Sequence, residues 1–353
     1  MVNEGAVVPA NQIRSYSFLA YMTWNGHSPD LLEQAETTIL SNVKVPFERF
    51  SVPLGSCVGK EDEVWTLTMN TDSKNTPIVM LHGFGAGIAF WLMNLEEIAA
   101  KRPLYAVDLL GFGRSSRPNF SKDATEIEDQ FVEFVECWRD KMQIEKMVLL
   151  GHSFGGFISS AYAMKYPNRV EHLILVDPWG FTEKPDLRNV ALWKRSLVKV
   201  FQRMRPLALI RAAGPYGEWL IKKARADILR KYEHAVEDQN VIAQYIHQCN
   251  SHRNPSGEEA FKNLLEGGPW AKNPIGERLK SEIKDDIPLT FLYGATSWMD
   301  NKYGEIFKEF RPTTSYTHIE SVAFAGHHVY SDNALDFNQY VNDACEIIKS
   351  KRT

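Results

Sequence analysis

The residue best placed to do chemistry in this sequence is a serine set between two glycines. Ser153 lies in the pentapeptide Gly-His-Ser-Phe-Gly at residues 151–155, with an apolar run over 147–150 before it and a helical pattern over 157–166 after it. G-x-S-x-G between a strand and a helix is typical of a nucleophile elbow, which exposes the serine oxygen above a sharp turn. The glycines are needed because larger side chains would collide in such a turn. The pattern predicts that Ser153 attacks an acyl carbonyl.

A serine hydroxyl needs a base to take its proton, and the base needs an acid to orient it. In this topology the base follows the last strand, and His327 comes directly after the apolar run YTHIESVAFAG at residues 316–326. His328 and His318 are the competing histidines. The position in the turn favours His327.

Two aspartates compete for the role of the acid. The usual place is the loop after the penultimate strand, here LYGATSWMD at residues 292–300. Its common aspartate position holds Ser297, and the nearest carboxylate is Asp300. We expect Asp300 to orient His327, with Asp177, at the end of the preceding strand, as the alternative acid.

The glycine-rich loop HGFGAG at residues 82–87 follows an apolar strand. It lacks the G-x-G-x-x-G spacing of a dinucleotide fingerprint. We expect an oxyanion loop instead, in which the backbone N–H groups of Phe84 and Phe154 hold the negative charge of a tetrahedral intermediate. His82 and His152 lie in tight turns and are predicted to be packing residues rather than metal ligands or bases.

Short apolar runs alternate with helical patterns along the chain, which predicts an α/β fold with a mostly parallel, eight-stranded sheet and helices on both faces. The first two runs alternate like an antiparallel hairpin at one edge. Strands are expected over 46–52, 63–69, 77–83, 104–108, 147–150, 172–180, 288–294 and 316–326, and helices over 31–43, 91–100, 125–142, 157–166 and 333–349.

The interval 179–285 breaks the alternation and reads as helices, which predicts a cap inserted over Ser153. The core is then 46–178 with 286–353. Within the cap, residues 184–231 carry 13 Lys or Arg and three acidic residues, in a chain whose net charge is −4. A basic amphipathic cap that contains aromatic side chains suits an anionic lipid surface or headgroup. The aromatic residues expected there are Trp193, Phe201 and Trp219. The alternative is an ordinary cap whose outer helical faces are solvated by lysines.

Residues 1–45 are expected to form an N-terminal extension. Phe18 and Trp24 lie in its aromatic patch, and such side chains favour membrane interfaces, so the extension is either packed on the domain or a peripheral lipid anchor. The N-terminus lacks the pattern of a secretory signal, and no apolar run is long enough to span a bilayer. We expect a soluble, cytoplasmic protein with peripheral contact to membranes or lipid droplets.

Composition excludes several classes of function. A net charge of −4 argues against binding to nucleic acid, and the four scattered cysteines indicate neither a zinc site nor a disulfide framework. No metal or organic cofactor is expected.

Five motifs resemble the α/β-hydrolase domain-containing protein 4/5 family, from about residue 47 to the C-terminus: HGFGAG, DLLGFGRSSRP, GHSFGG, LVDPWGF and GHHVYSD. The resemblance implies an α/β-hydrolase fold and work on phospholipids and acylglycerols at droplets or membranes. One family type is a lysophospholipase for N-acyl phosphatidylethanolamines and their lyso forms. The other is a droplet coactivator of a triacylglycerol lipase, with lysophosphatidate acyltransferase activity, asparagine at the elbow and a tryptophan-rich N-terminus. Ser153 matches the hydrolase type. Trp24 is the single tryptophan near the N-terminus of this sequence, which argues against strong droplet anchoring.

The resemblance leaves three functions open. We favour a serine hydrolase acting on acyl esters of phospholipids or lysophospholipids. The first alternative is an acyl-CoA-dependent lysophosphatidate acyltransferase, because His327 and Asp332 form the H-x4-D pattern that deprotonates the acceptor hydroxyl in glycerolipid acyltransferases. The second is a non-catalytic adaptor that binds a lipase or a droplet-coat protein.

Overall fold

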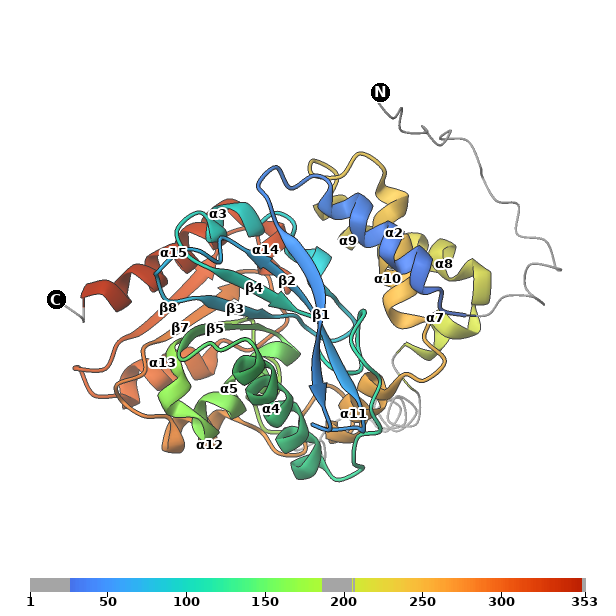
Figure 1. The fold of residues 1–353 in the computed structure, drawn as a ribbon. Coiled ribbons are helices and arrows are strands. Elements are labelled where there is room, and N and C mark those ends of the chain that lie inside the picture. Colours follow the sequence, from blue (N-terminus) through green and yellow to red (C-terminus); the bar gives the residue numbers. More distant parts are fainter. Residues whose placement is uncertain (1–25, 186–204, 206, 351–353) are drawn as a thin grey trace.

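An eight-stranded sheet forms the centre of the computed structural model, which describes residues 26–185, 205 and 207–350 (Figure 1). The strand order is β1-β2-β4-β3-β5-β6-β7-β8. β1 pairs with β2, and β2 with β4, in antiparallel fashion, and every other pairing is parallel. This confirms the predicted fold class. The strands are β1 (Glu48–Gly55), β2 (Asp62–Met69), β3 (Ile78–Leu81), β4 (Leu104–Val107), β5 (Met147–His152), β6 (Val170–Val176), β7 (Leu289–Gly294) and β8 (Thr317–Val322).

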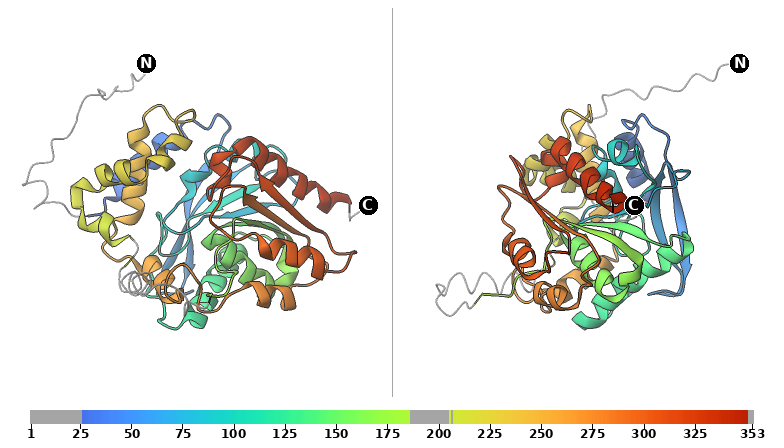
Figure 2. Two further views of the ribbon diagram at one scale, coloured as in Figure 1. Left: turned by 180° about the vertical axis from the view of Figure 1, so that it is seen from behind. Right: turned by 90° about the vertical axis from the view of Figure 1, so that its left-hand side faces the viewer.

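The central strands are buried along almost their whole length because helices cover both faces of the sheet. In β3, Ile78 and Met80 enter one core cluster, while Val79 and Leu81 enter the other. This follows from the alternation of side chains along a strand. Figure 2 shows the C-terminal helix α15 on the face opposite α4 and α5. One face carries α4 (Ala124–Lys141), α5 (Phe154–Lys165), α12 (Gly276–Glu282) and α13 (Lys302–Phe310); the other carries η1 (Ile88–Trp91), α3 (Leu95–Ala99), α14 (Val329–Asp332) and α15 (Ala334–Ser350).

Helix α4 shows how local sequence defines an element. Asp123 caps its N-terminus, where the side chain accepts hydrogen bonds from the N–H groups of Thr125 and Glu126. Arg139 and Lys141 lie in the last turn, where cations complement the helix dipole. The buried stripe contains Ile127, Phe131, Phe134 and Trp138, as the apolar spacing predicted.

The segment between β6 and β7, where the sequence predicts a cap, is mostly helical in its described part, and we keep the name cap for its helices. Its helices are α7 (Ala208–Ala212), α8 (Gly217–Ala224), α9 (Ala226–Lys231), α10 (Gln239–Asn250) and α11 (Ser256–Leu264), followed by α12 on the core. Figure 1 shows α7 to α10 gathered on one side of the sheet.

Helix α2 (Pro29–Leu40) packs on the cap, against α10, although it precedes the first strand in the chain. Gln248 in α10 ties down its start, since the backbone carbonyl contacts His27 at 3.0 Å and the side chain accepts a hydrogen bond from the N–H of Ser28. This part of the expected N-terminal extension is therefore joined to the cap.

Several residues singled out in the sequence lie outside the described part of the chain: Phe18, Trp24, Trp193 and Phe201. Among the helices that are described, none has the length and apolarity needed to cross a bilayer.

Candidate active site

Ser153 is the single residue between β5 and α5. Its backbone has a φ of 53° and a ψ of −114°, which is strained for a residue with a side chain. The flanking glycines are required: a Cβ on Gly151 would lie 2.3 Å from the carbonyl oxygen of Gly155, and one on Gly155 would lie 2.3 Å from that of Leu81. The structure thus contains the strand-to-helix turn that the pentapeptide predicts.

The imidazole of His327 lies between a hydroxyl and a carboxylate. Its Nε2 is 3.0 Å from Oγ of Ser153, and its Nδ1 is 2.6 Å from Oδ2 of Asp177. The Asp177 side chain is fully buried, whereas that of His327 is 17% exposed. A carboxylate only accepts hydrogen bonds, so the proton of the neutral ring is on Nδ1 and Nε2 is free to accept the serine proton.

The carboxylate beside His327 is that of Asp177, so the expectation that Asp300 takes this place is wrong. Asp300 is exposed and its Oδ1 accepts a hydrogen bond of 2.9 Å from the N–H of Lys302. Asp177 comes directly after β6, with a φ of 43°. Ser297 donates to its Oδ2 at 2.5 Å. One feature of the sequence pointed to Asp177: the usual aspartate position in the loop after β7 holds Ser297, so the carboxylate has to come from elsewhere.

The expected oxyanion loop packs in an aromatic cluster. The Phe84 ring stacks on Phe261 of the cap at 4.3 Å between centroids, and the Phe154 ring lies 4.9 Å from the same residue. Phe154 is the first residue of α5, where backbone N–H groups have no partner within the helix. Donation by Phe84 and Phe154 to an oxyanion stays a prediction.

The buried ring of His82 ties this loop to the residues that follow β4. Its Nδ1 lies 2.8 Å from the carbonyl oxygen of Gly83, and its Nε2 accepts a hydrogen bond of 3.0 Å from the N–H of Leu109. Burial lowers its pKa to about 4, so the ring is neutral near pH 7. Both ring nitrogens are occupied, as expected of a structural histidine.

His152, expected to be a packing residue, supports the backbone of His327. Its Nε2 donates a 2.9 Å hydrogen bond to the carbonyl oxygen of His327, and the two ring centroids are 4.8 Å apart. Burial, together with His327 and His328, lowers the pKa of His152 well below its usual value. The ring is therefore a neutral donor that holds the backbone of His327.

Asp332, the second residue of the H-x4-D pattern, does not bond to the ring of His327. Its Oδ2 accepts a hydrogen bond of 2.9 Å from the N–H of Gly326, and its Oδ1 lies 2.7 Å from Nζ of Lys231. Both nitrogens of His327 are taken by Asp177 and Ser153. Asp332 therefore cannot orient the imidazole by a direct hydrogen bond in this arrangement.

Two exposed aromatic residues lie in the loops around the histidine, and the sequence analysis missed both. The ring of Trp298 is 63% exposed and lies 5.3 Å from that of His327. Phe324 is 91% exposed and has a φ of 60°. Their loops are joined by hydrogen bonds from the backbone and side chain of Thr296 to the carbonyl of Ala325.

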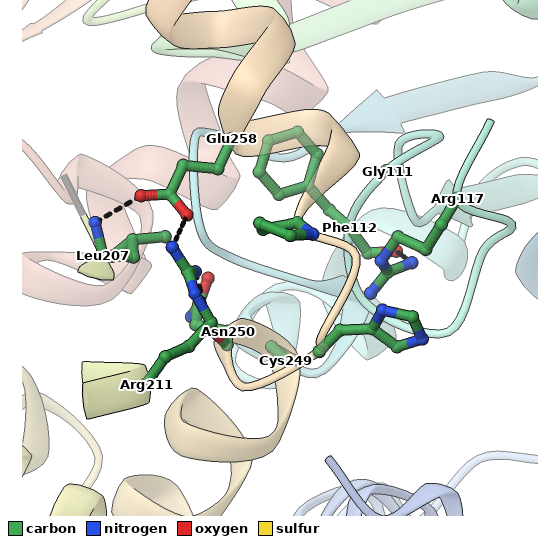
Figure 3. A pocket seen from close by; sticks show the side chains of 10 residues that line it. Gly111, Phe112, Arg117, Leu207, Arg211, Cys249, Asn250 and Glu258 are labelled. Atoms are coloured by element: carbon green, nitrogen blue, oxygen red, sulfur yellow. Dashed lines mark hydrogen bonds and ion pairs between the residues drawn. The ribbon is translucent and has the colours of Figure 1, made fainter. Parts of the chain in front are cut away.

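A small pocket lies between the cap and the loop after β4, and Gly111, Phe112, Arg211 and Asn250 are among the residues that line it (Figure 3). Asn250 at the end of α10 donates a 2.8 Å hydrogen bond to the carbonyl of Gly85, whose φ is +69°. Nearby, Glu258 accepts from the N–H of Leu207 at 2.6 Å and pairs with Arg211 at 2.5 Å. These contacts hold α7, α10 and α11 together next to the loop that carries Phe84.

Across the residues that the structure describes, no group of three or more His, Cys, Asp and Glu side chains is arranged to hold a metal ion.

A sheet of this order, a serine in an elbow and a His–Asp pair beside it define the α/β-hydrolase class. The family model for the alpha/beta hydrolase fold matches residues 76–334, and the chain belongs to this family. It is 43% identical over 322 residues to the rat 1-acylglycerol-3-phosphate O-acyltransferase ABHD5, covering 90% of each chain. It is 44% identical over 293 residues to the mouse (Lyso)-N-acylphosphatidylethanolamine lipase, covering 82% of this chain and 84% of the relative. The resemblance noted in the sequence is thus confirmed.

Solved structures agree on the fold. A membrane phospholipase A, described as a bacterial virulence factor, aligns with a TM-score of 0.63 at 20% identity, covering 91% of this chain and 92% of its own. Naproxen esterase from Bacillus subtilis aligns with a TM-score of 0.60 at 19% identity, covering 89% and 96%. At such identities the likeness concerns the fold alone.

Proposed function

We propose that this protein is a serine hydrolase that cleaves acyl esters of phospholipids or lysophospholipids. The observation that carries the proposal is the continuous contact from Ser153 through His327 to Asp177, at 3.0 and 2.6 Å. Three groups in this order, with the serine in a sharp strand-to-helix turn, are what acyl transfer to a hydroxyl requires.

In the first half of the reaction, Oγ of Ser153 attacks the acyl carbonyl while Nε2 of His327 takes its proton. The buried carboxylate of Asp177 stabilises the imidazolium that forms. The N–H groups of Phe84 and Phe154 hold the oxyanion, an effect worth about 10²- to 10³-fold in rate for each donor. His327 then gives its proton to the departing alcohol oxygen of the lipid.

In the second half, His327 takes a proton from water, and the hydroxide attacks the acyl-serine. Collapse of this second intermediate releases the fatty acid and returns the proton to Ser153. An acceptor lipid hydroxyl in place of water would give acyl transfer by the same residues, which accommodates the acyltransferase name of one relative without using Asp332.

A lipid substrate is supported by the cap and by the names of the relatives. Leu209, Tyr216 and Trp219 are exposed on the stretch from α7 to α8, and Lys222 and Lys223 lie in the last turn of α8. Apolar side chains next to lysines favour peripheral contact with an anionic lipid surface. We propose that the protein works at the surface of an intracellular membrane or a lipid droplet.

A fluorophosphonate probe and a lipid assay together test the proposal. We expect the probe to label the wild-type protein and Ser153→Ala to abolish labelling, with loss of fatty-acid release from lysophospholipid micelles. Ser281→Ala, on the exposed side of α12, is the matched control and should behave as wild type. An unlabelled wild-type protein that still activates a separate lipase would instead support the adaptor function.

The acyltransferase alternative has its own outcome in the same assay. If acyl-CoA-dependent transfer survives Ser153→Ala but is lost in Asp332→Asn, the H-x4-D chemistry is correct and the serine mechanism is wrong.

A further inference from the structure

Asp332 uses its two carboxylate oxygens for two different parts of the molecule. One accepts the N–H of Gly326, at 2.9 Å, and the other pairs with Lys231, at 2.7 Å. The Asp332 and Lys231 side chains are each only 14% exposed. Hydrogen bonds that involve charged groups are stronger than neutral ones, and partial burial reduces their screening by solvent. Asp332 therefore firmly joins the turn before His327 to the cap.

The Gly326 end of this connection acts on the backbone of the proposed base. Gly326 directly precedes His327, and its carbonyl oxygen lies so close to β7 that a Cβ on Gly294 would come within 2.1 Å of it. His152 holds the next carbonyl, that of His327, at 2.9 Å. The turn is thus fixed by β7, by His152 and by Asp332, and a small movement of Asp332 is passed to the imidazole.

The Lys231 end belongs to a well-packed part of the cap. Lys231 is the last residue of α9, and Tyr232 after it is fully buried. The hydroxyl of Tyr232 donates a 2.8 Å hydrogen bond to the carbonyl of Phe90. The packing of α9 therefore sets the position of the Lys231 ammonium group, which is not on a freely moving surface side chain.

We propose that Lys231 and Asp332 form a latch that couples the position of the cap to that of His327, so that Asp332 is a positioning residue of the hydrolase. The inference rests on the proposed function and gives the H-x4-D pattern a mechanical role. With the cap in place, Lys231 holds Asp332, and Asp332 holds the Gly326 N–H. Displacement of α9 breaks the ion pair and loosens the turn. Coupling between two sites is reciprocal, so binding that stabilises the cap also stabilises the productive position of His327.

The latch is tested by the rate of fluorophosphonate labelling in the full chain. Asp332→Ala removes both contacts, and we expect labelling to slow by about 10- to 100-fold, since small misplacements of a catalytic group carry costs of this size. Lys231→Met and Asp332→Asn keep an acceptor for Gly326, and each should slow labelling by about three- to ten-fold. The double variant Lys231→Met/Asp332→Asn should label at the same rate as either single variant, because each substitution already breaks the same ion pair.

A kinetic split and a matched variant separate positioning from general damage. With a soluble short-chain ester, the latch variants should lower kcat per labelled site and leave KM unchanged. Lys280→Met is the control, since it removes the 3.3 Å pair with Glu277 on α12, away from the site, and it should label as wild type. Wild-type labelling of Asp332→Ala, or multiplicative effects in the double variant, would overturn the latch.

Hydrogen exchange tests the same contact independently of hydrolysis. Lys231→Met should speed exchange in the peptide 323–333, and Asp332→Asn should speed exchange in α9. If neither peptide changes, the latch does not exist even in an active enzyme. If the wild type proves unreactive to the probe while both peptides respond, the proposed hydrolase fails and the coupling stands.

Discussion

Ser297 donates a hydrogen bond of 2.5 Å to Asp177, across the ends of β7 and β6. A hydroxyl thus occupies the loop position where the acid is expected, and the carboxylate comes from the neighbouring strand. The N–H of Gly294 adds a contact of 3.3 Å to the other oxygen of Asp177. Two donors and the ring of His327 keep this fully buried carboxylate fixed.

The first prediction distinguishes the two aspartates. Asp177→Asn should lower kcat by about 10⁴-fold, because an amide can no longer hold the imidazole in the required tautomer or stabilise its charge. Asp300→Asn should leave kcat within about two-fold of wild type, as expected for an exposed side chain that only caps a turn. Steady-state hydrolysis of a soluble ester measures both. Equal losses in the two variants would show that Asp177 is not the acid.

The second prediction moves the acid. In Asp177→Asn combined with Ser297→Asp, a carboxylate returns to within reach of the Nδ1 side of His327. We expect at least a ten-fold recovery of kcat over Asp177→Asn alone, or about 1.4 kcal/mol of transition-state stabilisation. Ser297→Asn in the same background is the matched control, since it has the same size and no charge. Recovery with asparagine would point to shape rather than charge.

The third prediction concerns the link between the cap and the oxyanion loop. Asn250→Ala removes the 2.8 Å hydrogen bond to the carbonyl of Gly85, and we expect kcat to fall by about ten-fold because the N–H of Phe84 is less well fixed. Gln248→Ala, two residues earlier on α10, instead removes the bond to Ser28. It should alter thermal stability and leave kcat unchanged. A kcat loss of the same size in Gln248→Ala would mean that the whole cap matters, and not this contact.

The fourth prediction uses a buried carboxyl group. Burial and, to a smaller extent, the negative charge of the nearby Asp108 raise the pKa of Glu36 to about 7. The ion pairs of Glu36 with Arg49 and Arg114 oppose this shift. A carboxyl whose pKa is higher in the folded than in the unfolded chain stabilises the fold at low pH, and this contribution is lost as the pH rises through the folded value. The free energy of unfolding attributable to Glu36 should therefore decrease between about pH 4.5 and 7.

Glu36→Gln should remove that part of the pH dependence. We expect the difference in unfolding free energy between the variant and the wild type, measured by urea denaturation, to shift in favour of the variant as the pH rises from 5 to 8. A difference that is constant over this range would show that Glu36 titrates near its ordinary pKa.

The sequence alone predicted most of the fold, and for clear reasons. Strands buried on both faces are continuous apolar runs, and α4 has both a cap and a periodic stripe, so these elements are visible locally. The helix expected over 91–100 is shorter in the structure, because η1 ends at Trp91 and α3 begins only at Leu95. Between them, the buried side chain of Asn94 bonds to the carbonyl of Tyr330 and to Asn338. Such contacts between distant residues cannot be seen in a local pattern.

The same limit explains the candidate site. Ser153 directly follows β5, and His327 follows β8 after a short turn, both among recognisable neighbours in the sequence. The structure places Oγ of Ser153 3.0 Å from Nε2 of His327. The choice between Asp177 and Asp300 depended on where each carboxylate points. The role of Asp332 depended on the position of Lys231 in the cap. Sequence spacing contains neither piece of information.

The packing of α2 against α10 has a consequence for synthesis of the protein on the ribosome. Leu32, Ala35, Ile39 and Leu40 of α2 are buried, yet the helix against which α2 packs ends only at Asn250. A chain made from its N-terminus must leave this apolar stripe uncovered while more than half of its length is translated. Nascent chains of this protein should therefore depend on chaperones until α10 emerges.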